Sequence, residues 1–100
     1  MISYTADKVI EILNGKGYHH SLEVYVRVAR KNYDESVRRL GYKYNYSEER
    51  KEELRRKVNE AEDAYLVMIQ VCKKMGKERY YENNKIRFEE LYQKKMELYW

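Results

Sequence analysis

The chain has 100 residues, of which 43% are hydrophobic and 38% charged, and its net charge is +4. This length fits one domain covering residues 1–100, and the large apolar share excludes a disordered chain. The sequence has no proline and only 4 glycines. β-Sandwiches and barrels need many tight turns, and tight turns need those residues, so we predict an all-α protein.

The cysteine content and the hydropathy pattern bear on where the protein works. Cys72 is the single cysteine, which excludes an internal disulfide and is typical of a reducing compartment. No apolar run approaches the roughly 18 residues of a membrane span, and residues 1–20 lack the apolar core of a signal peptide. We therefore expect a soluble, cytoplasmic protein that does not associate with membranes.

The first predicted element is a short helix from about Thr5 to Leu13, ended by the two glycines of residues 14–17. Its apolar face comprises Ala6, Val9, Ile10 and Leu13.

Residues 22–40 allow two interpretations. Leu22–Val28 contains β-branched residues in partial alternation, which favours a strand. A helical stripe runs unbroken through the same residues, and no second strand is available for pairing, so we predict one helix from Leu22 to Leu40. A bend near Asn32–Asp34 stays open, because Asp34 could cap a new helix. The stripe comprises Leu22, Val26, Ala29, Tyr33, Val37 and Leu40.

We predict that Ser47 caps a third and longest helix, which continues to Met75. Its apolar residues follow a heptad rhythm typical of a coiled coil: Leu54, Val58, Ala61, Tyr65, Met68, Cys72 and Met75. A final helix is predicted from Asn83 or Asn84 to near Trp100. Its apolar face comprises Phe88, Leu91, Tyr92, the aliphatic stem of Lys95, and Leu98 or Tyr99.

These elements predict a small antiparallel bundle of three to four helices with one long heptad-patterned helix. The third helix is longer than the first can cover, so a homodimer through its remaining apolar surface and a monomer are equal alternatives.

Tyrosine is unusually frequent, at 12 residues, and tyrosine and tryptophan are enriched at the energetic centres of protein interfaces. We therefore predict that another protein is the partner and that aromatic side chains fill its pockets. The candidates are Tyr42, Tyr44, Tyr46, Tyr80, Tyr81, Tyr92, Tyr99 and Trp100. The composition is also typical of small phage or mobile-element proteins that bind and disable a host factor.

The alternative prediction is a nucleic-acid-binding regulator with a basic, tyrosine-interleaved surface. Its candidate residues are Arg27, Arg30, Lys31, Arg38, Arg39, Lys43, Arg55 and Arg56. Acidic residues in the same stretch reduce its charge, and Glu52–Arg56 and Glu53–Lys57 have the spacing of ordinary helix-stabilising pairs. A helix-turn-helix is not expected, since residues 47–53 contain no apolar side chain to anchor a recognition helix.

Motifs for catalysis and metal binding are missing. The adjacent side chains of His19 and His20 diverge, and no nearby Cys or acidic pair completes a metal set. Cys72 lies on the apolar stripe, which favours a structural thiol. Phosphate-binding glycine loops, zinc spacings and nucleophile elbows are also absent. We expect no enzymatic activity, no catalytic residues, no bound metal and no cofactor.

Overall fold

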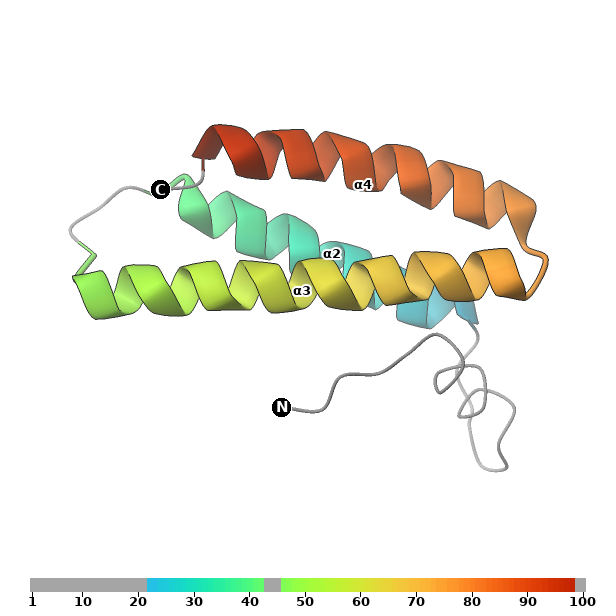
Figure 1. Ribbon diagram of the computed structural model, residues 1–100, viewed down its shortest axis with the longest axis horizontal. Helices are drawn as coiled ribbons and strands as arrows, with labels where there is room; N and C mark the ends of the chain where they lie inside the picture. The colour runs from blue at the N-terminus through green and yellow to red at the C-terminus, as the bar shows by residue number, and fades with distance from the viewer. Residues whose placement is uncertain (1–21, 43–45, 99–100) are drawn as a thin grey trace, which may run out of the picture.

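The computed structural model describes residues 22–42 and 46–98, which form three α-helices without any strand. Helix α2 spans Leu22–Leu40, α3 spans Glu48–Lys74 and α4 spans Glu78–Leu98 (Figure 1). The all-α prediction is confirmed. Residues 22–40 form one uninterrupted helix, so the strand interpretation of Leu22–Val28 and a helix break near Asn32–Asp34 are wrong. The predicted helix at Thr5–Leu13 lies outside the described residues.

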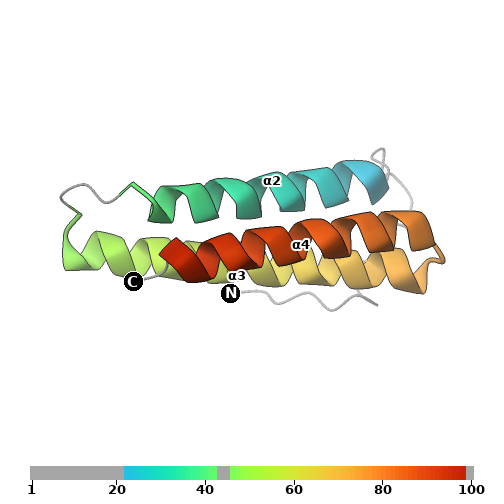
Figure 2. The same cartoon turned by 90° about the horizontal axis from the view of Figure 1, so that it is seen from above.

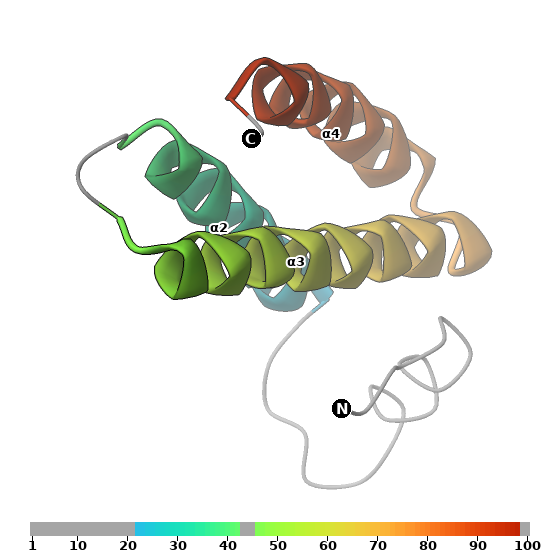
Figure 3. The same ribbon diagram turned by 60° about the vertical axis from the view of Figure 1, so that its left-hand side comes forward.

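Helices α2 and α4 both run antiparallel to α3 and are therefore parallel to each other (Figures 1 and 2). The middle of α2 contacts the middle of α4: Tyr33 stacks on Phe88 with ring centroids 5.6 Å apart, and Arg87 pairs with Asp34. Figure 3 shows α4 lying over one side of the α2–α3 pair. The opposite side of this pair is not covered by a described helix.

The predicted cap of α3 is confirmed, since the Ser47 side chain accepts a hydrogen bond from the Arg50 backbone N–H at 3.2 Å. The far end of α3 closes through Gly76, whose φ of 74° lies in the left-handed region. The Gly76 N–H donates to the Lys73 carbonyl, and the Lys77 N–H donates to the Cys72 carbonyl. These two bonds satisfy carbonyls that the end of a helix leaves without a donor, in the arrangement of a Schellman motif.

The predicted start of the last helix is wrong. Helix α4 begins at Glu78, five residues before Asn83, because Gly76 and Lys77 complete the reversal and the Lys77 carbonyl already accepts the Tyr81 N–H at 2.9 Å. Asn84 is not a cap but an interior helical residue, and its side-chain amide turns inward.

The apolar core follows the predicted stripes closely on α2, where all six residues of the stripe are buried. On α3 the buried face is wider than a heptad seam, since Ile69 and Val71 are buried as well. Met75, the last residue of the predicted heptad pattern, is 37% exposed. Apart from Leu91 of α4, every buried apolar side chain of the described residues lies on α2 or α3. Since full burial of such a side chain contributes about 1.5–3 kcal/mol of transfer free energy, the α2–α3 contact dominates this small core.

A layer of aromatic and polar side chains joins the three helices at the middle of the bundle. The rings of Tyr33, Tyr65 and Phe88 pack against one another with centroids 5.6–6.1 Å apart. The Tyr65 hydroxyl donates to the Asn84 side-chain oxygen at 2.8 Å, and the Tyr33 hydroxyl donates to a Glu62 carboxylate oxygen at 3.0 Å. No polar side-chain atom buried within the described residues lacks a hydrogen-bond partner. These hydrogen bonds offset the desolvation of the polar groups, and the layer fixes the register of the helices.

None of the described helices is both long enough and apolar enough to cross a membrane.

Candidate protein-binding site

The turn after α2 and the end of α4 come together at one end of the bundle. A β-carbon placed on Gly41 would lie 3.5 Å from Leu98 Cδ1 and 3.3 Å from the Arg38 carbonyl oxygen. The end of α4 therefore lies directly against the turn after α2, as Figure 1 shows, and a β-carbon at Gly41 would be in ordinary van der Waals contact with Leu98. We call the described residues Tyr42, Tyr46 and Leu98 the aromatic end. Tyr99 and Trp100 follow Leu98 directly in the chain, but they lie outside the described residues.

The two described tyrosines of the aromatic end differ in exposure. Tyr42 is 52% exposed, and its backbone N–H is held by the Arg39 carbonyl at 3.3 Å. Tyr46 is half-buried and packs against the hydrophobic core, as does Leu98. This end of the bundle therefore carries one exposed ring, that of Tyr42, and two side chains that pack against the core. Predicted site residues Lys43 and Tyr44 lie outside the described part of the chain.

Two predicted aromatic residues occupy the opposite end of the molecule. Tyr80 and Tyr81 lie in the first turn of α4, about 25 Å of helix away from Leu98 at 1.5 Å per residue. Tyr80 is 38% exposed, whereas Tyr81 is half-buried with the Lys73 and Lys85 ammonium groups 5.5 and 5.8 Å from its ring centroid. These residues cannot share one compact interface with the aromatic end.

Tyr92 belongs to the interior layer. Its ring stacks on Phe88 with centroids 6.1 Å apart and planes inclined by 22°, and the Lys95 ammonium lies 5.7 Å from its centroid. Both contacts lie within α4, where they place the half-buried Tyr92 ring beside Phe88 of the aromatic layer.

The basic residues of the alternative prediction do not gather on one face. Arg39 binds Glu35 at 2.7 Å and borders the open side of the α2–α3 pair. Its neighbour Arg38 binds Asp34, which in turn contacts Arg87 of α4 on the other side of α2. Other ion pairs of this stretch, within α3, are Arg50–Glu53, Lys51–Glu48, Arg56–Glu60 and Lys57–Glu53.

Ion pairing also affects titration, since the hydrogen bonds from Lys57 and Arg50 lower the pKa of Glu53. Several arginine and lysine side chains of this stretch thus already pair with a carboxylate. That carboxylate competes with a phosphate group for the same cation. Arg27, Arg30 and Lys31 lie on α2, and Arg55 lies on α3.

Comparison with profiles of known protein families, with curated proteins and with solved structures gives no match.

The described residues offer little for catalysis. Cys72 is fully buried, and desolvation raises the pKa of its thiol, so at neutral pH it is an un-ionised core side chain. No three His, Cys, Asp or Glu side chains among residues 22–42 and 46–98 come close enough together to hold a metal ion.

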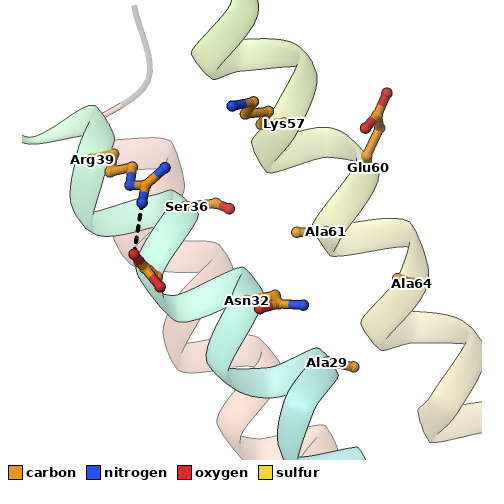
Figure 4. A pocket seen from close by; sticks show the side chains of 9 residues that line it. Ala29, Asn32, Ser36, Arg39, Lys57, Glu60, Ala61 and Ala64 are labelled. Carbon is orange, nitrogen blue, oxygen red and sulfur yellow. Dashed lines mark hydrogen bonds and ion pairs between the residues drawn. The ribbon is translucent and has the colours of Figure 1, made fainter. Parts of the chain in front are cut away.

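Sequence reasoning missed a groove between α2 and α3, on the side that α4 does not cover. Figure 4 shows its short side chains, Ala29 and Ser36 from α2 and Ala61 and Ala64 from α3, with the ribbon of α4 behind α2. Its volume is about 390 Å³. The sequence does contain a pattern that indicates the groove, which is the helical spacing of small residues on α2 and α3. Larger side chains at these positions would fill the space between the two helices.

Proposed function

We propose that this protein is a non-enzymatic helical module that binds another protein stoichiometrically through its aromatic end. The observation that carries the proposal is the contact between Gly41 and Leu98, because it joins two segments that the sequence had separated. One segment supplies Tyr42 and Tyr46, and the other leads directly into Tyr99 and Trp100.

The mechanism is occlusion of a partner surface. A half-exposed tyrosine such as Tyr42 already has its backbone fixed, so little conformational entropy is lost when its ring enters a pocket. Buried aromatic anchors at interface centres commonly contribute at least about 2 kcal/mol each. The rigid helices behind the turn support these rings, and the charged helix faces form a polar rim.

The size and composition of the chain favour a regulator or inhibitor of a larger protein, in the style of phage and mobile-element proteins. Binding of nucleic acid stays the alternative, and a dimer through the surface of α3 stays open. No particular contact in the structure favours either alternative, and a companion measurement tests binding of nucleic acid directly.

The test compares four forms of the full chain immobilised on a resin: wild type, Tyr42→Ala, Trp100→Ala and the matched control Tyr80→Ala. We expect one protein from a host lysate to be retained in defined stoichiometry by the wild type and by the control. Tyr42→Ala and Trp100→Ala should each weaken binding of the purified partner by at least about 30-fold, mainly through faster dissociation.

Equal retention by all four forms contradicts the aromatic end as the binding surface. Fluorescence anisotropy with labelled DNA and RNA at two salt concentrations is the companion measurement. Submicromolar binding that weakens steeply with salt would support the nucleic-acid alternative instead.

A further inference from the structure

The groove between α2 and α3 is lined by short side chains. Ala29, Ala61 and Ala64 line it together with the polar Asn32 and Ser36, and short side chains let the axes of two packed helices approach to about 8 Å. The borders are charged, with Glu35 and Arg39 on α2 and Lys57 and Glu60 on α3. Such a groove suits an amphipathic helix, whose apolar face would contact the alanine side chains. Its polar edges would lie beside the charged side chains of the borders.

Apolar side chains continue the groove toward the start of α2. Beyond the residues that line the groove, Tyr25 precedes Ala29 and Val28 precedes Asn32 by four residues, which places both on the same face of α2; Val28 is 49% exposed and Tyr25 is half-buried. On α3, Val67 follows Ala64 by one helical turn and is half-buried against the core. The apolar character therefore increases from the Arg39–Lys57 end of the groove toward Leu22.

We propose that residues 5–13 of this same chain occupy the groove as a short helix and convert the three described helices into a four-helix bundle. The sequence of this segment places Ala6, Val9, Ile10 and Leu13 on one face of a helix. Residues 14–21 then lead to Leu22, which is the end of α2 at which the groove is most apolar.

The length of the chain fits this occupant. A helix of nine residues is about 13 Å long, close to the roughly 12 Å that separate Val28 from Ser36 along α2. The eight residues between the segment and Leu22 span up to about 26 Å when extended. Gly15 and Gly17 within them allow the chain to reverse its direction.

Tethering favours this segment over other occupants. A segment joined by a short flexible connection reaches an effective concentration in the millimolar range at its own groove. A second copy of the chain or a free partner helix must compete from solution against that concentration.

Crosslinking tests the proposal in the full chain. Ile10→Cys is combined with Ala64→Cys in the groove or, as the control, with Ile86→Cys, which is an exposed position on α4. Cys72 stays in place because it is fully buried. With a short bismaleimide reagent we expect the Ile10–Ala64 pair to form an intrachain crosslink at least about tenfold faster than the control pair, as intact mass and peptide mapping would show.

Interchain crosslinks between residues 10 and 64 would overturn the proposal and assign the groove to a second copy. Equal rates for both pairs would overturn it as well and leave the groove open to a partner. A labelling experiment gives an independent answer, using Ala64→Cys with Ile10→Asp or with the control Lys8→Asp, since residue 8 lies on the opposite face of the predicted helix.

We expect Ile10→Asp to raise the maleimide labelling rate of the residue 64 thiol several-fold and Lys8→Asp to leave that rate unchanged. Equal effects of the two substitutions contradict docking of the apolar face. Adding Tyr42→Ala should not change either rate, so this result is independent of the function proposed for the aromatic end.

Discussion

Lys95 of α4 and Glu62 of α3 form an ion pair inside the bundle, with Lys95 Nζ 2.6 Å from Glu62 Oε2. Only 9% of the Lys95 side chain and 16% of the Glu62 side chain are exposed. The ammonium also donates to Asn59 Oδ1 at 3.1 Å, and the Tyr33 hydroxyl donates to the same Glu62 oxygen. One carboxylate of α3 therefore binds side chains from both other helices.

The first prediction concerns loss of this pair. Replacing Lys95 by Met keeps most of the apolar stem but leaves the Glu62 carboxylate without its counter-charge, which we expect to cost about 3 kcal/mol of unfolding free energy. Glu62→Gln in the same chain should recover at least about 1 kcal/mol, because it removes the charge that lost its partner. Urea denaturation of the two single variants and the double variant measures this coupling.

The neighbouring residue provides the control. Lys94 is exposed, and Lys94→Met should change stability by less than about 0.5 kcal/mol. Additive effects of Lys95→Met and Glu62→Gln would contradict a direct interaction between the two charges.

The second prediction concerns Asn84, which is 3% exposed. Its side-chain oxygen accepts from the Tyr65 hydroxyl at 2.8 Å, and its amide nitrogen donates to the Tyr80 carbonyl at 2.8 Å. In Asn84→Ala the Tyr65 hydroxyl keeps only its longer hydrogen bond, to the backbone carbonyl of residue 84. We therefore expect the free energy of unfolding to fall by about 1–2 kcal/mol.

Thermal unfolding measures this loss of stability as a fall in Tm of roughly 4–16 °C for a domain of this size. Asn83→Ala is the matched control, since the adjacent side chain is exposed. A similar Tm for both variants would show that the inward amide contributes nothing.

The sequence predicted correctly those parts of the fold that depend on residues close to one another in the chain. The stripe of α2 predicts its buried face because a helix repeats locally, and Ser47 predicts the start of α3 because a cap needs only its own turn. The start of α4 was wrong because Asn83 and Asn84 also suit a cap by composition. The reversal at Gly76 had already let the helix begin at Glu78.

The parts that it did not predict depend on register between helices. Nothing in the order of residues pairs Glu62 with Lys95, or Tyr65 with Asn84, because those contacts join positions 33 and 19 residues apart. The use of Tyr42 and Tyr46 in an interface stays a prediction from their residue type. The Gly41–Leu98 contact that brings the two segments of the aromatic end together required the structure.

The third prediction concerns alkaline pH. Burial raises the pKa of Tyr65 to about 12 from an ordinary value of 10.0, and burial together with Glu62 also raises the pKa of Tyr33. A raised pKa in the folded state means that the stabilisation is complete below pH 10 and is lost as pH rises from 10 through 12. We expect the urea midpoint to fall across this interval.

Tyr65→Phe should flatten that fall, because the unfolded state no longer gains from ionisation of this hydroxyl. The comparison at pH 8 is the control, where the difference between the two proteins reports only the hydrogen bonds and packing of Tyr65. Parallel pH profiles for the two proteins would contradict the buried, protonated state of the Tyr65 hydroxyl.

The last prediction isolates the backbone of the α3–α4 turn. Gly76 has a φ of 74°, and a β-carbon at this position would meet no atom within 4 Å. Gly76→Ala therefore introduces no clash with other groups, and its cost of about 1 kcal/mol comes from the left-handed conformation itself. Gly76→Asn should be less destabilising, since asparagine tolerates this region better. If urea denaturation shows the alanine variant to be as stable as the wild type, the turn must have adopted another conformation, and the reversal that starts α4 at Glu78 would not require a left-handed residue.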